Sequence, residues 1–145
     1  MEDEQAIIEK AMALIYDKAA QRYSKTLVDH GINPRNHGLM ENPDGYASFT
    51  GTCGDTMEIF IRARNGIIED IMFDTDGCAF TIAAGSVLTE MAKGKSFAKC
   101  LGINQSAILA ELENMPEDHS HCALLAALTF HKALKECSGK MKKSG

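Results

Sequence analysis

The chain has 145 residues, of which 45% are hydrophobic, and a formal net charge of −5 at pH 7. Because a chain of roughly 150 residues buries about 70% of its unfolded surface, we expect one domain with a substantial core over residues 1–145. The acidic balance argues against binding of nucleic acid or of an acidic membrane surface, and no apolar run approaches the ~20 residues of a membrane span. The acidic start, Met1–Glu4, is unlike a basic signal peptide, so we expect a soluble protein of the reducing cytoplasm.

A helix is expected at the N-terminal end of the chain. Apolar residues follow helical spacing over Glu4–Asp29, and residues 1–20 form an N-terminal helical extension of the domain. Gly31 and Pro34 end this helix, and the sequence Asn42–Gly45 is typical of a turn.

A small sheet is expected in the middle of the chain. Short β-like runs cover Tyr46–Thr50, Met57–Arg64 and Ile67–Phe73. Between the last two lies Asn65-Gly66, a strong hairpin signal, because both central residues of a type I′ turn need a positive φ.

Helical patterns return after the sheet. They cover Phe80–Met91, Ser96–Leu101, Asn104–Glu113 and Ser120–Glu136, with Ser96 and Asn104 as N-caps and Leu124, Leu125, Leu128 and Leu134 facing inward. The basic tail, residues 138–145, is expected to be flexible. The fold class is therefore α+β, a small three-stranded antiparallel sheet with helices packed on one face.

Five cysteines are spread widely along the chain, at positions Cys53, Cys78, Cys100, Cys122 and Cys137. An odd number of cysteines without an export signal favours reduced thiols and metal chemistry over a disulfide framework. Cys100 lies in a short apolar helix and is interpreted as a packed hydrophobic residue. Cys137, near the flexible tail, is expected to be an exposed thiol without a role.

The hairpin brings two of these thiols together. A two-residue loop sets the register of the strands, and outward from it Asp55 would face Asp76 and Cys53 would face Cys78. Directly opposed Cβ atoms are about 5 Å apart, so two thiols and a carboxylate should converge at one end of the hairpin. Cys78 also opens a helix, whose dipole stabilises a thiolate or an anionic cluster.

A third thiol, Cys122, lies near the start of the last helix, with His121 beside it and His119 two residues earlier. Adjacent helical side chains point about 100° apart, so His121 and Cys122 need not bind the same metal. Cys, His and Asp are the ligands of first-row metals, and three sulfurs select zinc or iron–sulfur. The residues of this candidate metal site are Cys53, Asp55, Cys78, His121 and Cys122. A Cys/His nucleophilic enzyme is the weaker hypothesis, because it needs fewer thiols.

Several segments resemble the iron–sulfur cluster assembly scaffolds of the IscU / NifU N-terminal type, over roughly residues 20 to 137. The matching segments are Tyr23-Ser24-Lys25, Asp29–Asn36, Cys53–Met57, Asp76-Gly77-Cys78 and His121-Cys122. The resemblance implies a SufE/NifU-like α+β fold. It also implies a scaffold or carrier rather than an enzyme.

The resemblance further implies what the site holds. Cys53, Cys78 and Cys122 would bind a transient [2Fe–2S] cluster, with Asp55 or His121 completing the coordination, and Zn²⁺ is often found in the same site. Cys122 occupies the position of the acceptor of persulfide sulfur from a cysteine desulfurase. The finished cluster would pass to apo iron–sulfur client proteins.

Two departures from the family bear on its partners and on the alternatives. Many bacterial members carry Leu-Pro-Pro-Val-Lys before His-Cys, the contact for an Hsp70-type chaperone, and the acidic segment Met115–His119 here argues against that partnership. No insertion typical of the zinc-dependent SufU branch lies between Cys78 and Cys122. A SufU-like sulfur acceptor working with a cysteine desulfurase is nevertheless kept as the first alternative, and a structural zinc module as the second.

Overall fold

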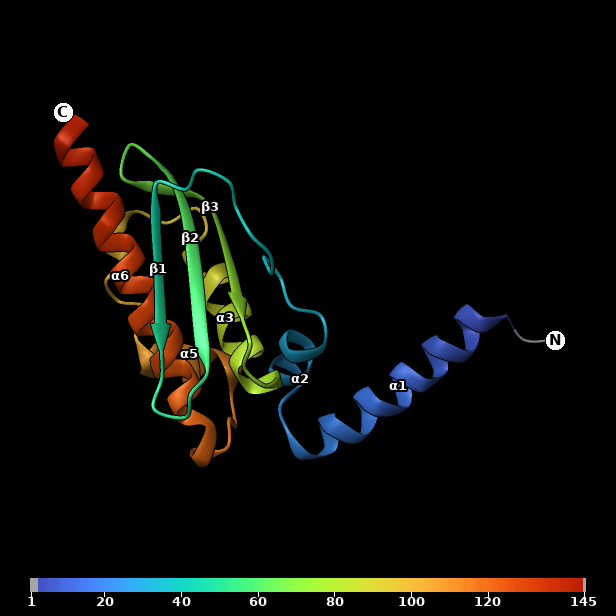
Figure 1. Cartoon of the computed structure of the whole chain (residues 1–145). Helices are drawn as coiled ribbons and strands as arrows, with labels where there is room; N and C mark the ends of the chain where they lie inside the picture. The colour runs from blue at the N-terminus through green and yellow to red at the C-terminus, as the bar shows by residue number, and fades with distance from the viewer. Residues whose placement is uncertain (1–2, 145) are drawn as a thin grey trace.

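The computed structural model describes residues 3–144, apart from the side chains of Tyr16, Ala20 and residues 140–144. Its centre is an antiparallel sheet of three strands in the order β1-β2-β3. The strands are β1 (Gly45–Thr50), β2 (Thr56–Arg64) and β3 (Ile67–Thr75). Helix α6 packs on β1 and β2 and helix α3 packs on β3, and both helices lie behind the sheet in Figure 1. The predicted α+β fold is confirmed.

The N-terminal helical region is broken into two helices, so the prediction of one continuous helix is wrong. Helix α1 (Glu4–Arg22) ends before Tyr23, which is extended, and α2 (Lys25–Ile32) starts afresh. Ser24 is the N-cap of α2, because its hydroxyl accepts a hydrogen bond of 3.0 Å from the Leu27 amide. A serine side chain that bonds the backbone in this way favours a helix start over a helix interior.

Helix α1 projects away from the rest of the molecule (Figure 1). Its large apolar residues are exposed: Ile7, Ile8, Met12, Leu14 and Ile15. The apolar spacing that predicts a helix therefore does not mark a face buried in the core of this chain.

The hairpin between β2 and β3 has the predicted turn, since Asn65 and Gly66 have φ values of 54° and 74°. Farther from the turn the register shifts, because Ala63 pairs with Ile68 whereas Arg62 pairs with Asp70. Glu69 is thereby left without a facing residue, as in a β-bulge.

The bulge overturns the predicted pairing at the far end of the hairpin. Met57 faces Thr75, one residue out of step with the expected register, so Cys53 does not face Cys78 and Asp55 does not face Asp76. The bulge has a packing reason, because it lets both Ile68 and Ile71 of β3 face the core despite their odd spacing.

The remaining helices lie close to their predicted positions. They are α3 (Ala79–Ala92), α4 (Phe97–Cys100), α5 (Gln105–Leu112), the 3₁₀ helix η1 (Glu117–His119) and α6 (Ser120–Ser144). The predicted N-caps are confirmed, since the side chains of Ser96 and Asn104 accept from the amides of Lys99 and Ala107.

Helix α6 continues to Ser144, where the sequence predicts a helix end at Glu136 and a tail. Cys137 is fully buried, so the prediction of an exposed thiol is wrong. Cys137 is buried because α6 packs closely against β1. The contact is so close that a Cβ added to Gly45 would overlap the Cys137 sulfur and the Ala133 carbonyl. A glycine at the start of β1 lets the end of α6 come close.

The core lies between the sheet and the helices behind it. Its largest fully buried side chains include Phe73, Phe130, Met57, Ile59 and Ile61.

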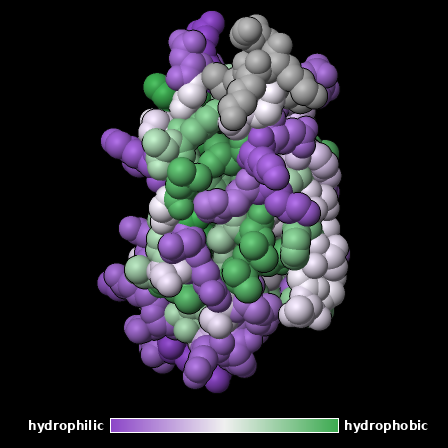
Figure 2. Space-filling view, turned by 90° about the vertical axis from the view of Figure 1, so that its left-hand side faces the viewer, coloured by the Kyte–Doolittle hydropathy of each residue, from purple (hydrophilic) through white to green (hydrophobic). Residues whose placement is uncertain are grey.

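Of the four leucines predicted to face inward from α6, Leu125 and Leu134 are buried, whereas Leu124 and Leu128 are exposed. Figure 2, viewed from the side of α6, shows hydrophobic residues between hydrophilic ones on this surface. Among the described residues no helix is both long and apolar enough to cross a membrane.

Candidate metal centre

Three segments that are distant in the sequence meet at one end of the sheet. Cys78 is the N-cap residue of α3, directly after β3, and Cys122 lies in the first turn of α6. The turn between β1 and β2 carries Cys53 and is closed by a hydrogen bond of 2.8 Å from the Gly51 amide to the Asp55 carbonyl. This turn and the start of α6 lie at the lower end of the sheet in Figure 1.

Two of the predicted thiols come within reach of one metal ion. The sulfurs of Cys78 and Cys122 and a ligand atom of His119 all lie within 4.8 Å of one another. Over the described part of the chain, this is the one such group of three or more Cys, His, Asp or Glu residues. Cys78 is exposed, His119 is half-buried and Cys122 is 1% exposed, so the group runs from the surface into the core.

The hydroxyl of Thr81 lies in the middle of this group. Its Oγ1 is 3.3 Å from Oδ2 of Asp55 and 3.3 Å from Sγ of Cys122, and it lies 3.9 Å from Sγ of Cys78. Thr81 is fully buried, and a Cβ added to Gly77 would lie 2.7 Å from it, so Gly77 makes room for Thr81. Sequence reasoning missed Thr81, although its position one helical turn after Cys78 was a usable signal.

The imidazole in the group is His119, whereas the sequence predicts His121. The His119 ring stacks on the ring of Phe80, with centroids 4.0 Å apart and an interplanar angle of 20°. His121 lies beside Cys122, with Nε2 3.8 Å from Sγ, but it is outside the group of three. The roles predicted for Cys53, Asp55 and His121 as ligands stay predictions.

Burial and negative charge act together on the innermost thiol. Burial, more than any other cause, raises the pKa of Cys122 to about 11. The hydrogen bond from Thr81 lowers this pKa, and the charges of Cys78, Cys53 and Asp55 raise it. A bound cation would relieve this crowding of anionic groups, and two sulfurs with an imidazole suit zinc or iron.

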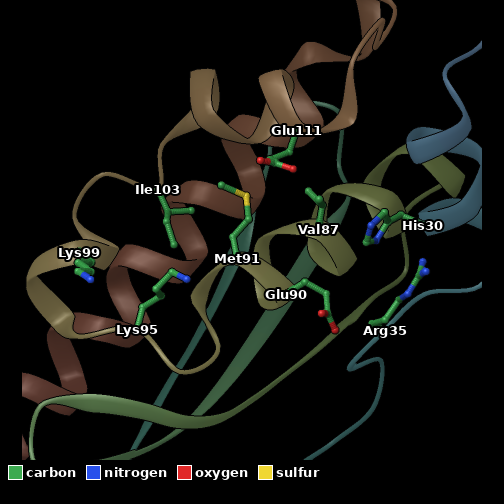
Figure 3. A pocket seen from close by; sticks show the side chains of 9 residues that line it. All are labelled: His30, Arg35, Val87, Glu90, Met91, Lys95, Lys99, Ile103 and Glu111. Carbon is green, nitrogen blue, oxygen red and sulfur yellow. The ribbon is translucent and has the colours of Figure 1, made fainter.

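Another hollow, of about 500 Å³, lies along α3 and contains no cysteine. Its lining, shown in Figure 3, consists of His30, Arg35, Val87, Glu90, Met91, Lys95, Lys99, Ile103 and Glu111. His30 is half-buried here, with Nδ1 2.6 Å from Oγ of Ser86. Burial lowers the pKa of His30. With charges of both signs and none of the clustered thiols, this hollow is separate from the metal centre.

Comparison with known proteins agrees with this geometry. The family model of the NifU-like N terminal domain matches residues 22–144. The chain belongs to the NifU-like N-terminal domain family. The match begins at the last residue of α1, so most of that helix lies outside the NifU-like region.

The relatives of this NifU-like chain include proteins named as iron–sulfur cluster assembly scaffold protein IscU. IscU 1 of Archaeoglobus fulgidus is 42% identical over 113 residues, which cover 77% of this chain and 74% of the relative. IscU of Escherichia coli is 38% identical over 123 residues, covering 81% of this chain and 95% of the relative.

Solved structures share the fold. A NifU-like protein (N-terminal) from Brucella abortus aligns with a TM-score of 0.70 at 17% identity, over 82% of this chain and 96% of the other. The SUF-system protein FiSufU from Fervidobacterium islandicum aligns with a TM-score of 0.64 at 23% identity, over 79% and 97% of the two chains. The resemblance noted from the cysteine motifs is confirmed.

Proposed function

We propose that this NifU-like domain is a scaffold that assembles a [2Fe–2S] cluster from iron and persulfide-derived sulfur and transfers the cluster to apo-proteins. The observation that carries the proposal is the approach of Cys78 and Cys122, from different elements, to one buried hydroxyl that also contacts Asp55. The relatives named as IscU scaffolds support it.

The ligands proposed for the cluster are Cys53, Cys78 and Cys122, with Asp55 or His121 completing the set. Cys53 is exposed on the turn between β1 and β2, so its thiol is open to incoming iron. A carboxylate oxygen is a hard ligand and a poor match for a soft iron–sulfur site. Coordination by Asp55 would therefore favour release of the cluster, as a scaffold requires, over permanent retention.

Sulfur is proposed to arrive at Cys122. Its thiolate attacks the outer sulfur of a persulfide on a cysteine desulfurase, the S–S bond of the donor breaks, and the desulfurase thiolate leaves. Because Cys122 is 1% exposed, the donor reaches its sulfur only after a local movement uncovers it. Reduction of the bound sulfur to sulfide takes electrons from ferrous iron, which becomes ferric, and from an external thiol, which becomes a disulfide.

The proposed partners are therefore a cysteine desulfurase and the apo-proteins that receive the cluster. The domain itself acts as a carrier and not as an enzyme. All five cysteines lie in the described part of the chain and none forms a disulfide, which fits the cytoplasm as the proposed compartment.

A second candidate function follows from the same donors. Two sulfurs and an imidazole, from Cys78, Cys122 and His119, also suit Zn²⁺. The second candidate is a zinc-dependent sulfur acceptor of the SufU type, also working with a cysteine desulfurase.

Anaerobic reconstitution tests the proposal. The protein is mixed with a purified desulfurase, cysteine, ferrous iron and dithiothreitol, and the sulfide-to-iron absorption bands are followed in the visible range. We expect the bands to grow, to require Cys78 and Cys122, and to move to an apo-ferredoxin added afterwards. Cys100→Ala, which changes a buried thiol away from the site, is the matched control and should leave the bands unchanged.

Two other results would reject the scaffold. Zinc that stays bound while the protein stimulates the desulfurase, without iron bands, would favour the zinc-dependent acceptor. Inertness toward both iron and desulfurase, with zinc retained, would leave a structural zinc module.

A further inference from the structure

We propose that the exposed apolar face of α1 pairs, antiparallel, with the same face of a second copy of this chain. This inference goes beyond the proposed function, because it concerns a helix that lies almost wholly outside the residues matched by the family model. It gives α1 a role as the dimerisation element of the protein.

Helix α1 leaves a large apolar surface uncovered. Its side chains Ile7, Ile8, Met12, Leu14 and Ile15 are each between 46% and 63% exposed. At 100° per residue, all five lie within an arc of roughly 160° on one side of the helix. The helix projects from the domain (Figure 1) and makes its main contacts with α2. Five such side chains amount to several hundred Å², about as much contiguous apolar surface as a soluble monomer usually carries.

A helix with this face uncovered lacks its usual source of stability. Most helical stability in proteins comes from packing of the amphipathic face, and a helix in isolation is marginal in water. A second helix laid along the face would supply that packing. The two faces together would bury on the order of 1,000 Å², which is the size of a weak but specific interface.

The two ends of α1 carry opposite charges on the side of the apolar face. Glu4 lies in the first turn and Arg22 in the last, and their 18 positions make about five full turns, so both project from the same side. Between them, at alternating steps of four and three residues, lie Ile8, Ala11, Ile15 and Lys18. This spacing is the seam of a two-stranded coiled coil, with an acidic start and a basic end.

This charge pattern fits a second copy in the antiparallel direction. When Ala11 of one helix faces Ile15 of the other, Glu4 faces Arg22 at both ends of the pair, and the stem of Lys18 covers Ile8. A parallel pair would instead oppose Glu4 to Glu4 and Arg22 to Arg22. The helix dipoles favour the antiparallel pair as well. The face is therefore complementary to itself, as the interface of a twofold dimer must be.

The pairing keeps the two domains apart. Each domain follows the C-terminal end of its own α1, so the domains lie at opposite ends of the helix pair, about 28 Å apart along its axis. The cysteines of each metal centre belong to the turn after β1 and to the starts of α3 and α6, and the pairing uses none of them.

Sedimentation equilibrium of the full chain, under reducing conditions and across the micromolar range, tests the pairing. We expect the mean mass to rise with concentration from 15.8 kDa toward twice that value. Ile8→Asp and Ile15→Asp should each weaken the dimer at least about tenfold, because each removes two apolar side chains from the seam. The matched control is Ala13→Asp, which adds the same charge on the opposite, exposed side of α1 and should keep the wild-type Kd.

Two charge variants test the direction of the pair. Glu4→Arg and Arg22→Glu should each weaken the dimer about tenfold, because two attractive contacts become repulsive. An equal mixture of the two variants should regain the wild-type Kd, because opposite charges then meet at both ends. A parallel pair would be indifferent to either change alone. Far-UV circular dichroism and the thermal midpoint show that each variant is folded.

A wild-type protein that stays a monomer at every concentration overturns the inference. The same holds if Ala13→Asp weakens the dimer as much as Ile15→Asp does, or if neither charge variant weakens it. A monomer that co-sediments with vesicles of phosphatidylcholine and phosphatidylglycerol would assign the face to a membrane surface instead. None of these outcomes affects cluster assembly, so the inference and the proposed function fail independently.

Discussion

Replacing Thr81 by valine removes one hydroxyl from the middle of the metal centre and keeps the shape of the side chain. Thr81 is fully buried, and its hydroxyl lies 3.3 Å both from Sγ of Cys122 and from Oδ2 of Asp55. A hydrogen bond contributes about 0.5–1.5 kcal/mol net, so Thr81→Val should lower the free energy of unfolding of the apoprotein by about 1 kcal/mol. In a domain of this size that lowers Tm by roughly 3 °C.

The same change should alter the reactivity of Cys122. The Thr81 hydroxyl lowers the pKa of this thiol, which burial raises to about 11. In Thr81→Val the pKa rises further, so less thiolate is present and alkylation by iodoacetamide at pH 9 should slow. Mass spectrometry of the digested protein measures the rate at Cys122, with the buried thiol of Cys100 as the internal reference.

Thr81→Ser is the matched control, because it keeps the hydroxyl and loses only a methyl group. Thr81→Ser should keep the wild-type alkylation rate, whereas Thr81→Val should not. Equal rates for Cys122 in all three proteins would refute the role assigned to the hydroxyl. A Thr81→Val protein as stable as the wild type would refute the stabilising contribution of the hydroxyl.

Three further predictions concern the site and the packing of α6. The pKa of Cys122 is raised from an ordinary value of 9.0 to about 11, so between these pH values only the unfolded thiol loses its proton. Unfolding of the apoprotein should become easier as pH rises through this window, by at most about 3 kcal/mol. Urea denaturation at several pH values measures the slope, which Cys122→Ala should flatten. Asp55→Ala should give a longer-lived cluster, because a hard ligand is removed; decay of the visible absorption as fast as in the wild type would count against it. Gly45→Ala drives a methyl group into Cys137 and Ala133 of α6 and should cost about 1–3 kcal/mol in chemical denaturation; an unchanged midpoint would contradict the close packing of α6 on β1.

Local signals predicted the elements well, because neighbouring residues decide them. The turn Asn65-Gly66 needs a positive φ at both residues, and both have it. Ser96 and Asn104 accept hydrogen bonds from amides three residues ahead, a contact that needs no distant partner. The cysteine motifs likewise indicate the family, because they depend on residue type and local spacing alone.

Signals that spread over a longer stretch were less reliable. Helical spacing runs through Tyr23 and Ser24, yet the hydroxyl of Ser24 caps a new helix and also donates to the carbonyl of Leu112, 88 residues away in the chain. The apolar residues of α1 follow helical spacing, but they face solvent. Periodicity shows that a helix forms and says nothing of what covers it.

The sequence by itself determined the α+β class, the hairpin turn, the helix caps and the choice of Cys78 and Cys122 as thiols that come together, since each depends on residue type and motif. Only the tertiary structure decided the bulge at Glu69, the burial of Cys137, and the approach of His119 to Cys78 and Cys122. A one-residue bulge turns every later side chain of a strand to the other face, and its cause is the packing of Ile68 and Ile71 against helices formed elsewhere in the chain. The ring of His119 is likewise held by Phe80 from a different helix, a contact that no spacing within its own segment reveals.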